Sequence, residues 1–252
     1  MIYLYLFVMG SIMGSFYLVL ATRGSLEKSI ISPRSHCDNC NQKLQWFLLI
    51  PILSYLFTGG KCYYCKKNIS ILNPLVEIIT GLSFMLAYYL FGISYLFWAS
   101  LIVFSLLIII FISDFKYYII LDSPLVISSI AILLLKYYYF GPKTSLKALI
   151  CGFIMFGIVY LIKKFGDFLF KKESLGGGDI KLSFFLGVLL GLRLSLVSFI
   201  LSSFLALPYA LASAYLSQKK EVPFGPFIIF SATLIFIYMD KFTNLLNFFF
   251  SI

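Results

Sequence analysis

The chain has 252 residues, of which 61% are hydrophobic and only 12% are charged. Soluble domains average about 45–50% apolar and about 25% charged residues, so this composition excludes an ordinary soluble domain. In a soluble protein the net charge of +10 would suggest nucleic-acid binding. In a membrane protein it has another origin, because Lys and Arg gather in the loops that stay on the cytoplasmic side. We therefore expect the lipid bilayer, and no nucleic acid, as a partner.

Apolar runs recur along the whole chain, and most approach the length of about 20 residues that crosses a roughly 30 Å hydrocarbon core as a helix. They predict an all-α polytopic membrane protein with about eight transmembrane helices. The sixth run is short and ends at a glycine, so we expect it to be tilted or only partly buried. The first run lacks a basic leader region and a cleavage site, and is interpreted as a span rather than a signal peptide. The runs lie near residues 1–22, 74–92, 94–113, 119–135, 147–162, 180–191, 194–216 and 225–239.

The basic residues orient these spans. If the N-terminus lies outside, only five of the 20 Lys and Arg residues face the outside, namely Lys136, Lys143, Lys147, Arg193 and Lys241. The remaining 15 then face the cytoplasm, as positive-inside orientation requires. We therefore expect a multi-pass protein of the cell membrane with its N-terminus outside and the polar stretch 23–73 in the cytoplasm.

Four of the five cysteines form two pairs within this stretch, Cys37 with Cys40 and Cys62 with Cys65. Each CxxC turn can present two thiolates to one ion, and two turns complete a tetrahedral zinc site. Such a closed site folds the stretch around it and leaves no open position for catalysis. Disulfides fit poorly with a reducing cytoplasm, and a redox CxxC pair is the weaker alternative. The apolar insert 46–57 is too short to span the bilayer and is expected in its interface or against the helices.

Only ten Asp and Glu residues occur, and ionisable groups at membrane helices are costly enough to be candidates for function. Asp114 ends the third predicted span and Asp179 opens the sixth, so both fall at the cytoplasmic face. Gly176, Gly177 and Gly178 precede Asp179, and glycines permit unusual backbone conformations and the close approach of another segment. A flexible turn followed by an N-cap aspartate is the alternative interpretation.

Two carboxylates held close together cannot both ionise easily, so they share a proton. One can then act as general base on a water molecule while the other polarises the scissile carbonyl. The residues thus predict aspartic-type peptide hydrolysis by Asp114 and Asp179. Three further acids are weaker candidates: Asp122 as a helix cap, Glu173 as a group that orients the glycine loop, and Glu77 as the partner of a basic residue in the 23–73 stretch.

Further motifs lie between these residues, and their order along the chain is specific. They are Gly14-Ser15-Phe16 with Arg23, Ser35-His36-Cys37-Asp38-Asn39-Cys40, Gly59-Gly60-Lys61-Cys62-Tyr63-Tyr64-Cys65, Asn73-Pro74-Leu75-Val76-Glu77-Ile78-Ile79-Thr80-Gly81, Asp114 with Asp122, Gly176-Gly177-Gly178-Asp179-Ile180-Lys181-Leu182, and Val222-Pro223-Phe224-Gly225-Pro226-Phe227. Nearly from end to end the chain resembles the prepilin peptidase (type IV leader peptidase) family of GxGD aspartyl proteases, including its competence-pseudopilus relatives. It departs from the family pattern at Leu18 and Leu121, which stand where Asn and Pro are frequent.

The resemblance implies an enzyme that cleaves the basic leader from type IV prepilin or pseudopilin substrates at the cytoplasmic membrane face, with Asp114 and Asp179 as the catalytic pair. Many members also methylate the new N-terminus with S-adenosylmethionine, although no nucleotide-binding glycine loop is evident here. The domains expected are a first span at 1–22, a cytoplasmic four-cysteine, zinc-ribbon-like module at 23–73 and a membrane-embedded peptidase domain at 74–252.

Other classes of membrane protein fit less well. A transporter or proton channel would also place carboxylates in its spans, but usually near the midplane and within inverted repeats. A pure assembly protein would explain the cysteines and leave Asp114 and Asp179 without a role. Presenilin-type and preflagellin peptidases share the glycine–aspartate loop and lack the four-cysteine module.

Overall fold

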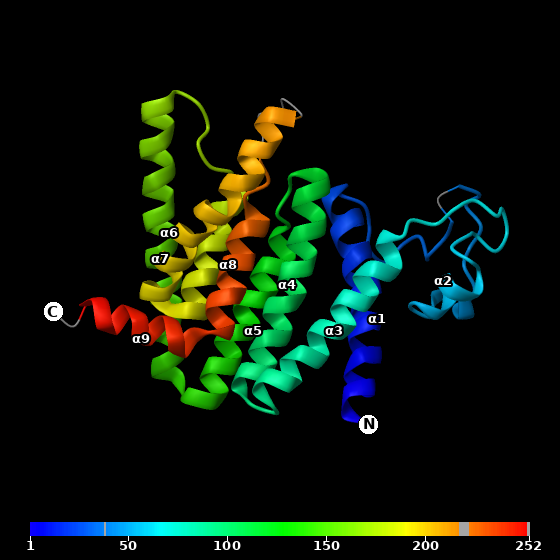
Figure 1. Cartoon of the computed structure of the whole chain (residues 1–252), viewed down its shortest axis with the longest axis horizontal. Helices are drawn as coiled ribbons and strands as arrows, with labels where there is room; N and C mark the ends of the chain where they lie inside the picture. Colours follow the sequence, from blue (N-terminus) through cyan, green and yellow to red (C-terminus); the bar gives the residue numbers. More distant parts are fainter. Residues whose placement is uncertain (38, 217–221, 251–252) are drawn as a thin grey trace. The chain divides into compact units, whose positions relative to one another are not determined.

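The computed structural model describes residues 1–37, 39–216 and 222–250, and all statements about structure concern these residues. They form nine α-helices and one 3-10 helix, with two isolated antiparallel bridges and no strand among them. In chain order the elements are α1 (Ile2–Ser25), η1 (Trp46–Leu49), α2 (Leu53–Phe57), α3 (Leu72–Phe91), α4 (Tyr95–Tyr117), α5 (Asp122–Phe140), α6 (Pro142–Phe170), α7 (Gly177–Leu216), α8 (Gly225–Ile237) and α9 (Met239–Phe250) (Figure 1). The all-α prediction is confirmed.

Six of the described helices are long and apolar enough to cross a membrane, or seven if α8 and α9, bent by 85°, are counted as one span. Each apolar run predicted from the sequence overlaps one of these helices or the bent pair. The predicted number was higher because α7 contains two of the runs, 180–191 and 194–216. The chain is therefore a multi-pass membrane protein.

By its packing the chain divides into two compact units, Met1–Ile112 and Ser113–Ile252, and α4 carries the chain from the first into the second. This division follows contacts in space, whereas the boundaries predicted near residues 22 and 73 follow the expected roles of the segments. The predicted domains therefore stay a prediction.

In the first unit α1 packs closely against α3, and glycines make the close approach possible (Figure 1). A Cβ added to Gly10 would lie 2.8 Å from the Cα of Gly81, and one added to Gly14 would lie 2.7 Å from the Oγ1 of Thr80. Small residues spaced four apart are a frequent means of bringing membrane helices together, because the backbones can then touch. The hydroxyl of Tyr17 lies 2.6 Å from that of Ser105 and links α1 to the first part of α4.

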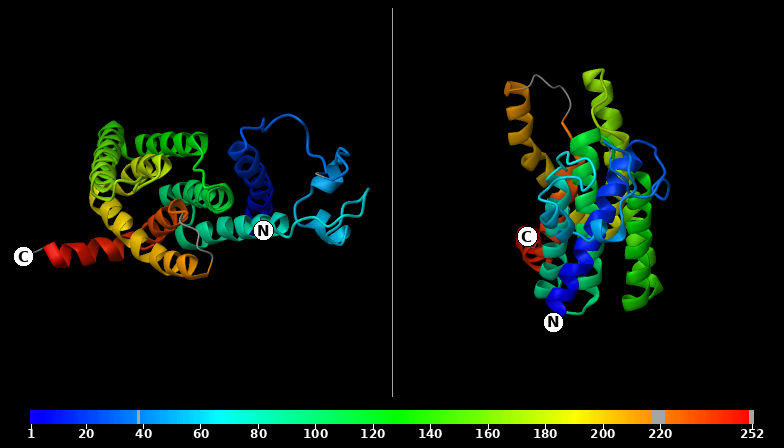
Figure 2. Two further views of the ribbon diagram at one scale, coloured as in Figure 1. Left: turned by 90° about the horizontal axis from the view of Figure 1, so that it is seen from above. Right: turned by 90° about the vertical axis from the view of Figure 1, so that its right-hand side faces the viewer.

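The segment between α1 and α3 contains η1 and α2 and lies to one side of α1, past the N-terminal end of α3 (Figure 2, left). It is held to α3 by Glu77, whose buried carboxylate accepts a hydrogen bond of 2.7 Å from the backbone N–H of Ile52. Ile52 has φ 62° and ψ −54°, which is a rare conformation for a β-branched residue. Among the described residues the prediction that Glu77 pairs with a basic side chain is wrong, because its partners are the backbone N–H of Ile52 and the side chain of Ser15.

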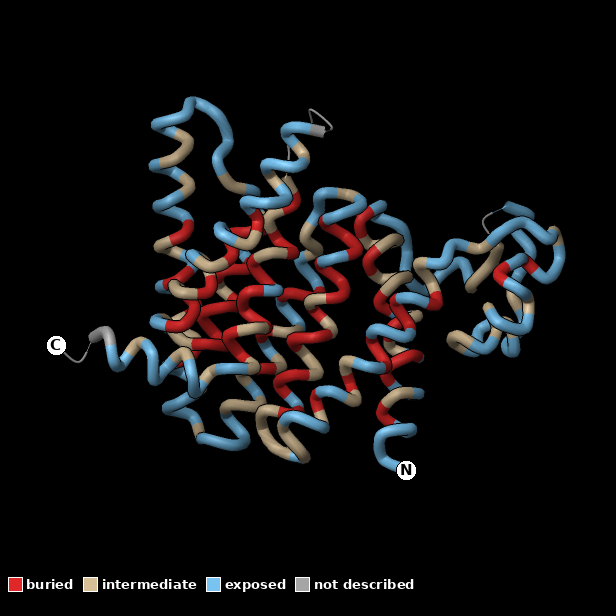
Figure 3. Tube along the Cα trace, viewed as in Figure 1, coloured by how far each residue is buried: buried red, intermediate tan, exposed pale blue. Residues whose placement is uncertain are grey.

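In the second unit α7 packs against α5, α6 and α8. The α6–α7 contact is close because both helices carry a glycine there: a Cβ on Gly187 would lie 2.5 Å from the carbonyl oxygen of Cys151 and 2.7 Å from the Cα of Gly152. Between α7 and α8 the hydroxyls of Ser198 and Ser231 lie 3.0 Å apart. Buried positions gather along the sides where these helices meet (Figure 3).

The helix α7 is broken at Gly191, which has φ 74° and ψ 171°. An unbroken helix of its 40 residues would be about 60 Å long, or twice the thickness of the hydrocarbon core. The break frees backbone carbonyls that need donors in an apolar medium. Lys136 of α5 supplies them, since its Nζ donates to the carbonyls of Val188 (2.7 Å) and Leu189 (3.1 Å). The two segments of α7 therefore meet at a stabilised break, and the first of them begins near Asp179.

Candidate active site and metal centre

Asp114 lies in the last turn of α4 and is buried, with 6% of its surface exposed. Its Oδ2 accepts a hydrogen bond of 3.1 Å from the backbone N–H of Gly225, the first residue of α8. The first N–H groups of a helix have no partner within the helix, and Pro226 has none to offer. The N-terminus of α8 therefore presents a free donor, and its positive dipole end favours a carboxylate.

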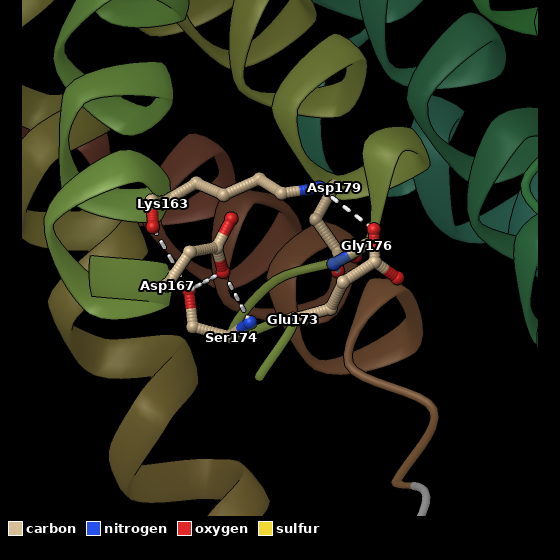
Figure 4. Close-up of polar contacts among 6 residues, drawn as sticks. All are labelled: Lys163, Asp167, Glu173, Ser174, Gly176 and Asp179. Atoms are coloured by element: carbon tan, nitrogen blue, oxygen red, sulfur yellow. Dashed lines mark hydrogen bonds and ion pairs between the residues drawn. The ribbon is translucent and has the colours of Figure 1, made fainter. Parts of the chain in front are cut away.

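Asp179 lies in the first turn of α7 and is also buried, with 8% of its surface exposed. Its Oδ2 accepts a hydrogen bond of 3.2 Å from the backbone N–H of Gly176, just before the helix begins. The same contact is drawn in Figure 4. Each of the two aspartates is thus held by the backbone N–H of a glycine at a helix N-terminus.

Ile120, in the link between α4 and α5, packs against both helix starts. A Cβ on Gly178 would lie 2.8 Å from the Cβ of Ile120, and a Cβ on Gly225 would lie 2.7 Å from its Cδ1 and 2.9 Å from the Oδ2 of Asp114. Asp114 and Asp179 interact electrostatically. The structure therefore brings the two aspartates into one site, and their catalytic role stays a prediction.

The three glycines before Asp179 differ in what they contribute. None of them has a positive φ, so unusual backbone conformation is not the reason for glycine here. Gly176 donates to Asp179, and Gly178 lies against Ile120 with no room for a Cβ, whereas a Cβ on Gly177 would meet nothing within 4 Å. Close approach of another segment is therefore the reason that applies, and it applies at Gly178.

Asp122 and Glu173, which were predicted as weaker acidic site residues, have partners that the sequence did not predict. Asp122 is the first residue of α5 and makes no cap hydrogen bond there; both of its oxygens accept from the Nζ of Lys181, each at 2.7 Å. This pair is largely exposed, and exposed pairs contribute only about 0–1 kcal/mol. Glu173 forms an ion pair of 3.6 Å with Lys163 (Figure 4).

Three residues near the aspartates were missed as site residues. Gly225 belongs to the segment 222–227, for which no role was predicted, and it lies 111 positions from Asp114. Ile120 and Lys163 carried no signal that distinguishes them from other apolar and basic residues. The one feature of the sequence that could have indicated a site residue is a polar or glycine residue at a helix start directly after a loop. Of the three residues, only Gly225 has this feature.

The four paired cysteines form one cluster in the first unit. Their Sγ atoms all lie within 4.8 Å of one another, and the Sγ atoms of Cys37 and Cys65 are 3.8 Å apart. This spacing is too long for a disulfide. It equals the edge of about 3.8 Å that a tetrahedron has when its zinc–sulfur bonds are 2.3 Å long. The donor set and its spacing therefore fit a structural zinc ion held by Cys37, Cys40, Cys62 and Cys65.

The two cysteine turns have the same backbone pattern. In each turn the N–H of the first cysteine donates to the backbone carbonyl of the residue five positions later. The carbonyl of the same cysteine accepts from the N–H of the residue four positions later, which has a positive φ. The bonds are Cys37 to Gln42 (3.1 Å), Asn41 to Cys37 (2.8 Å), Cys62 to Lys67 (2.8 Å) and Lys66 to Cys62 (3.0 Å). The backbone N–H groups of Cys40 and Asn39 lower the pKa of the Cys37 thiol to about 6. Burial and the neighbouring cysteine side chains raise the pKa of the Cys40 thiol to about 11. Of these two thiols, Cys37 is therefore the one that readily forms the thiolate, which is the form that binds metal.

The family models and the curated relatives that match this chain agree with one another. The family model of the bacterial peptidase A24 N-terminal domain matches residues 8–91, and that of the type IV leader peptidase family matches residues 101–211. A prepilin leader peptidase/N-methyltransferase of Bacillus subtilis is 33% identical over 245 residues, which cover 94% of each chain. One of Vibrio cholerae is 31% identical over 93% of this chain and 96% of its own. No solved structure matches significantly.

The contrast between the glycines gives a first prediction. Gly178→Ala forces a Cβ into Ile120 and displaces the start of α7, and a displacement of about 1 Å at a catalytic group can reduce a rate on the order of 100-fold. Gly177→Ala, whose Cβ meets open space, is expected to stay close to the wild-type rate. Initial rates of peptide cleavage by the two purified variants test this. Equal rates for both would show that the Ile120 contact does not position Asp179.

A second prediction concerns the metal. Purified protein should contain about one zinc per chain, and replacing any of the four clustered cysteines by serine should lower this content and make the 23–73 stretch more sensitive to protease. Cys151→Ser, in α6, is the matched control and should leave the zinc content and the protease sensitivity unchanged. Elemental analysis and limited proteolysis measure the two effects. Native protein purified without chelators and found free of metal would contradict the assignment.

Proposed function

Because this chain belongs to the type IV leader peptidase family, we propose that it cleaves the basic leader peptide from type IV prepilin-like proteins, with Asp114 and Asp179 as its catalytic aspartates. The observation that carries the proposal is the pair of buried carboxylates, each held by a glycine N–H at a helix start. Both lie in the part of the chain that the family model matches, residues 101–211.

The geometry supports a general acid–base mechanism. The two carboxylates share one proton, because two negative charges held close together are unfavourable. The ionised member takes a proton from water, and the resulting hydroxide attacks the carbonyl carbon of the scissile peptide bond. The protonated member hydrogen-bonds to the carbonyl oxygen and stabilises its developing charge. The carbon–nitrogen bond then breaks, and a proton passes to the departing amine.

The position of the site along the spans suits a substrate whose leader is basic and whose following segment is apolar. Such a leader stays in the cytoplasm, and the apolar segment enters the bilayer, so the scissile bond lies at the cytoplasmic boundary. Asp114 is at the end of α4 and Asp179 at the start of α7. The distribution of Lys and Arg supports an orientation that puts both ends, and the cysteine module, at the cytoplasmic face of the bacterial cell membrane.

The curated relatives are named as N-methyltransferases as well as peptidases. We extend N-methylation of the new N-terminus, with S-adenosylmethionine as methyl donor, to this chain on its family membership alone. The described residues contain no glycine-rich loop after a strand, since they form no strand, so we assign no residue to this activity. The zinc ion would order the 23–73 module and supplies no step of the peptidase reaction.

The catalytic assignment predicts that Asp114→Asn and Asp179→Asn each abolish leader cleavage, because neither partner alone can hold and transfer the shared proton. Expression and membrane insertion should stay normal, since amide and carboxylate have the same shape. Asp122→Asn, which alters an exposed ion pair, should have a much milder effect. Incubation of each purified variant with a prepilin in detergent, followed by mass spectrometry, reports leader loss and any added methyl group. Substantial cleavage by either aspartate variant would remove that residue from the pair.

The orientation predicts which positions a membrane-impermeant maleimide reaches in intact cells. A cysteine introduced by Lys143→Cys, at the start of α6, should react from outside. One introduced by Lys172→Cys, in the loop before α7, should react only after the membrane is opened. The unmodified protein is the background control, because its clustered cysteines are expected inside. Reaction of Lys172→Cys in intact cells would place the loop before Asp179 on the outer face and end the proposed orientation.

A further inference from the structure

Two adjacent lysines near the end of α6 have different surroundings. Lys164 is exposed, and its Nζ lies over the ring of Tyr160, 5.4 Å from the ring centroid, as in a cation–π contact. Only 18% of the Lys163 side chain is exposed, although it carries a charge. Sequence reasoning gave both the same role, namely to keep this end of the helix in the cytoplasm. The structure separates them.

The loop between α6 and α7 folds back onto the face of α6 that carries Lys163. Ser174 makes the attachment: its N–H donates to Asp167 (2.6 Å), and its hydroxyl contacts Asp167 (2.9 Å) and the backbone carbonyl of Lys163 (3.1 Å). Gly166 makes room for it, because a Cβ there would lie 2.6 Å from the Ser174 hydroxyl. Residues spaced three and four apart share one face of a helix. The attachment therefore fixes the loop directly beside Lys163.

The folded loop places the lysine between two acids. The Nζ of Lys163 is 3.6 Å from the Oε1 of Glu173, and its charge also acts on Asp179 and on Asp167. Figure 4 shows the side chain reaching from α6 toward Glu173 and Asp179. Glu173 is 88% exposed and is well solvated by itself, whereas Asp179 is buried. Asp179, as the buried acid, therefore gains more from the ammonium than the exposed Glu173 does.

Two other charged side chains near the site have partners of their own. Asp167, on α6, accepts a hydrogen bond from the N–H of Ser174 in the loop. Lys181 follows Asp179 by two positions, but its Nζ is held by both oxygens of Asp122. A shared-proton pair carries one negative charge, which is costly in an apolar surrounding unless a cation compensates for it.

We propose that Lys163 is a positioning residue of the peptidase site, whose ammonium group, held by Glu173, compensates for the negative charge of the Asp114–Asp179 pair. The inference rests on the proposed function, since it names the cation that serves the same two aspartates. Lys163 acts through Asp179 and touches neither substrate nor scissile bond. Its removal should therefore slow the chemical step and leave substrate binding intact.

The test compares three variants in purified form with a prepilin substrate. Lys163→Met removes the charge and keeps the length of the side chain, and is expected to lower kcat on the order of 10- to 100-fold with KM unchanged, as for an electrostatic contribution to the transition state. Lys163→Arg keeps the charge and should restore most of kcat. Lys164→Met is the matched control, one position away with the same loss of charge, and should behave as wild type.

Thermal unfolding in the same detergent checks that Lys163→Met is as stable as Lys164→Met. If it is less stable, Glu173→Gln serves instead, because it alters only the exposed holder of the ammonium and is expected to lower kcat by a smaller factor with KM unchanged.

Four results would overturn the inference. They are wild-type kcat for Lys163→Met, an increase in KM alone, equal losses for Lys163→Met and Lys164→Met, and failure of Lys163→Arg to restore kcat. Asp114→Asn and Asp179→Asn are assayed in parallel. If those two lose cleavage while the Lys163 variants do not, only the role of Lys163 fails. If they retain cleavage, the proposed function fails and the role of Lys163 fails with it.

Discussion

A carboxylate at the end of an apolar helix needs hydrogen-bond donors, and at membrane depth few side chains can supply them. In this protein the backbone supplies them. Gly176 and Gly225 each present an N–H at a helix start, where the helix itself leaves donors unused. Hydrogen bonds to charged groups contribute about 1.5–3 kcal/mol, which is more than an exposed ion pair such as Asp122–Lys181 provides. The positions of α7 and α8 in the second unit therefore matter chiefly for what their first residues offer to the aspartates.

In the cysteine module, too, the main chain orients the ligand atoms, which are thiolate sulfurs in place of carboxylate oxygens. The two turns share one pattern of backbone hydrogen bonds, and the positive φ of Asn41 and Lys66 lets each turn close tightly. In the first turn the N–H groups of Asn39 and Cys40 also bond to the sulfur of Cys37. In both sites, then, the main chain orients negatively charged ligand atoms. The distinction lies in what remains free. The four sulfurs complete the shell of one ion, whereas each aspartate keeps an oxygen that is not bound to its glycine.

The sequence was sufficient for the parts of the structure that local pattern controls. Apolar runs predicted the helices, and CxxC spacing predicted the cluster of four sulfurs, because each depends on residues close together in the chain. Contacts between distant segments were not predictable. Gly225 meets Asp114 across 111 positions, and Lys163 pairs with Glu173 only because Ser174 folds the loop onto α6. Asp122 looked like a helix cap, since its pairing with Lys181 depends on how α5 and α7 pack. The break in α7 was read as the boundary of two helices, and the role of Lys136 in stabilising it had no local sign.

Ile120 makes contact with the glycines at both helix starts and carries no charge itself. It acts as a spacer, so the separation of the two carboxylates is determined partly by the volume of one apolar side chain. A bulkier residue there would push the helix starts apart, and a smaller one would let them approach, without any change in the acids or their donors. The strength with which two aspartates hold a common proton depends on their separation, because the repulsion between two negative charges falls as the distance between them grows. Natural variation at this apolar position would thus adjust the acidity at which the site works while leaving its chemistry the same.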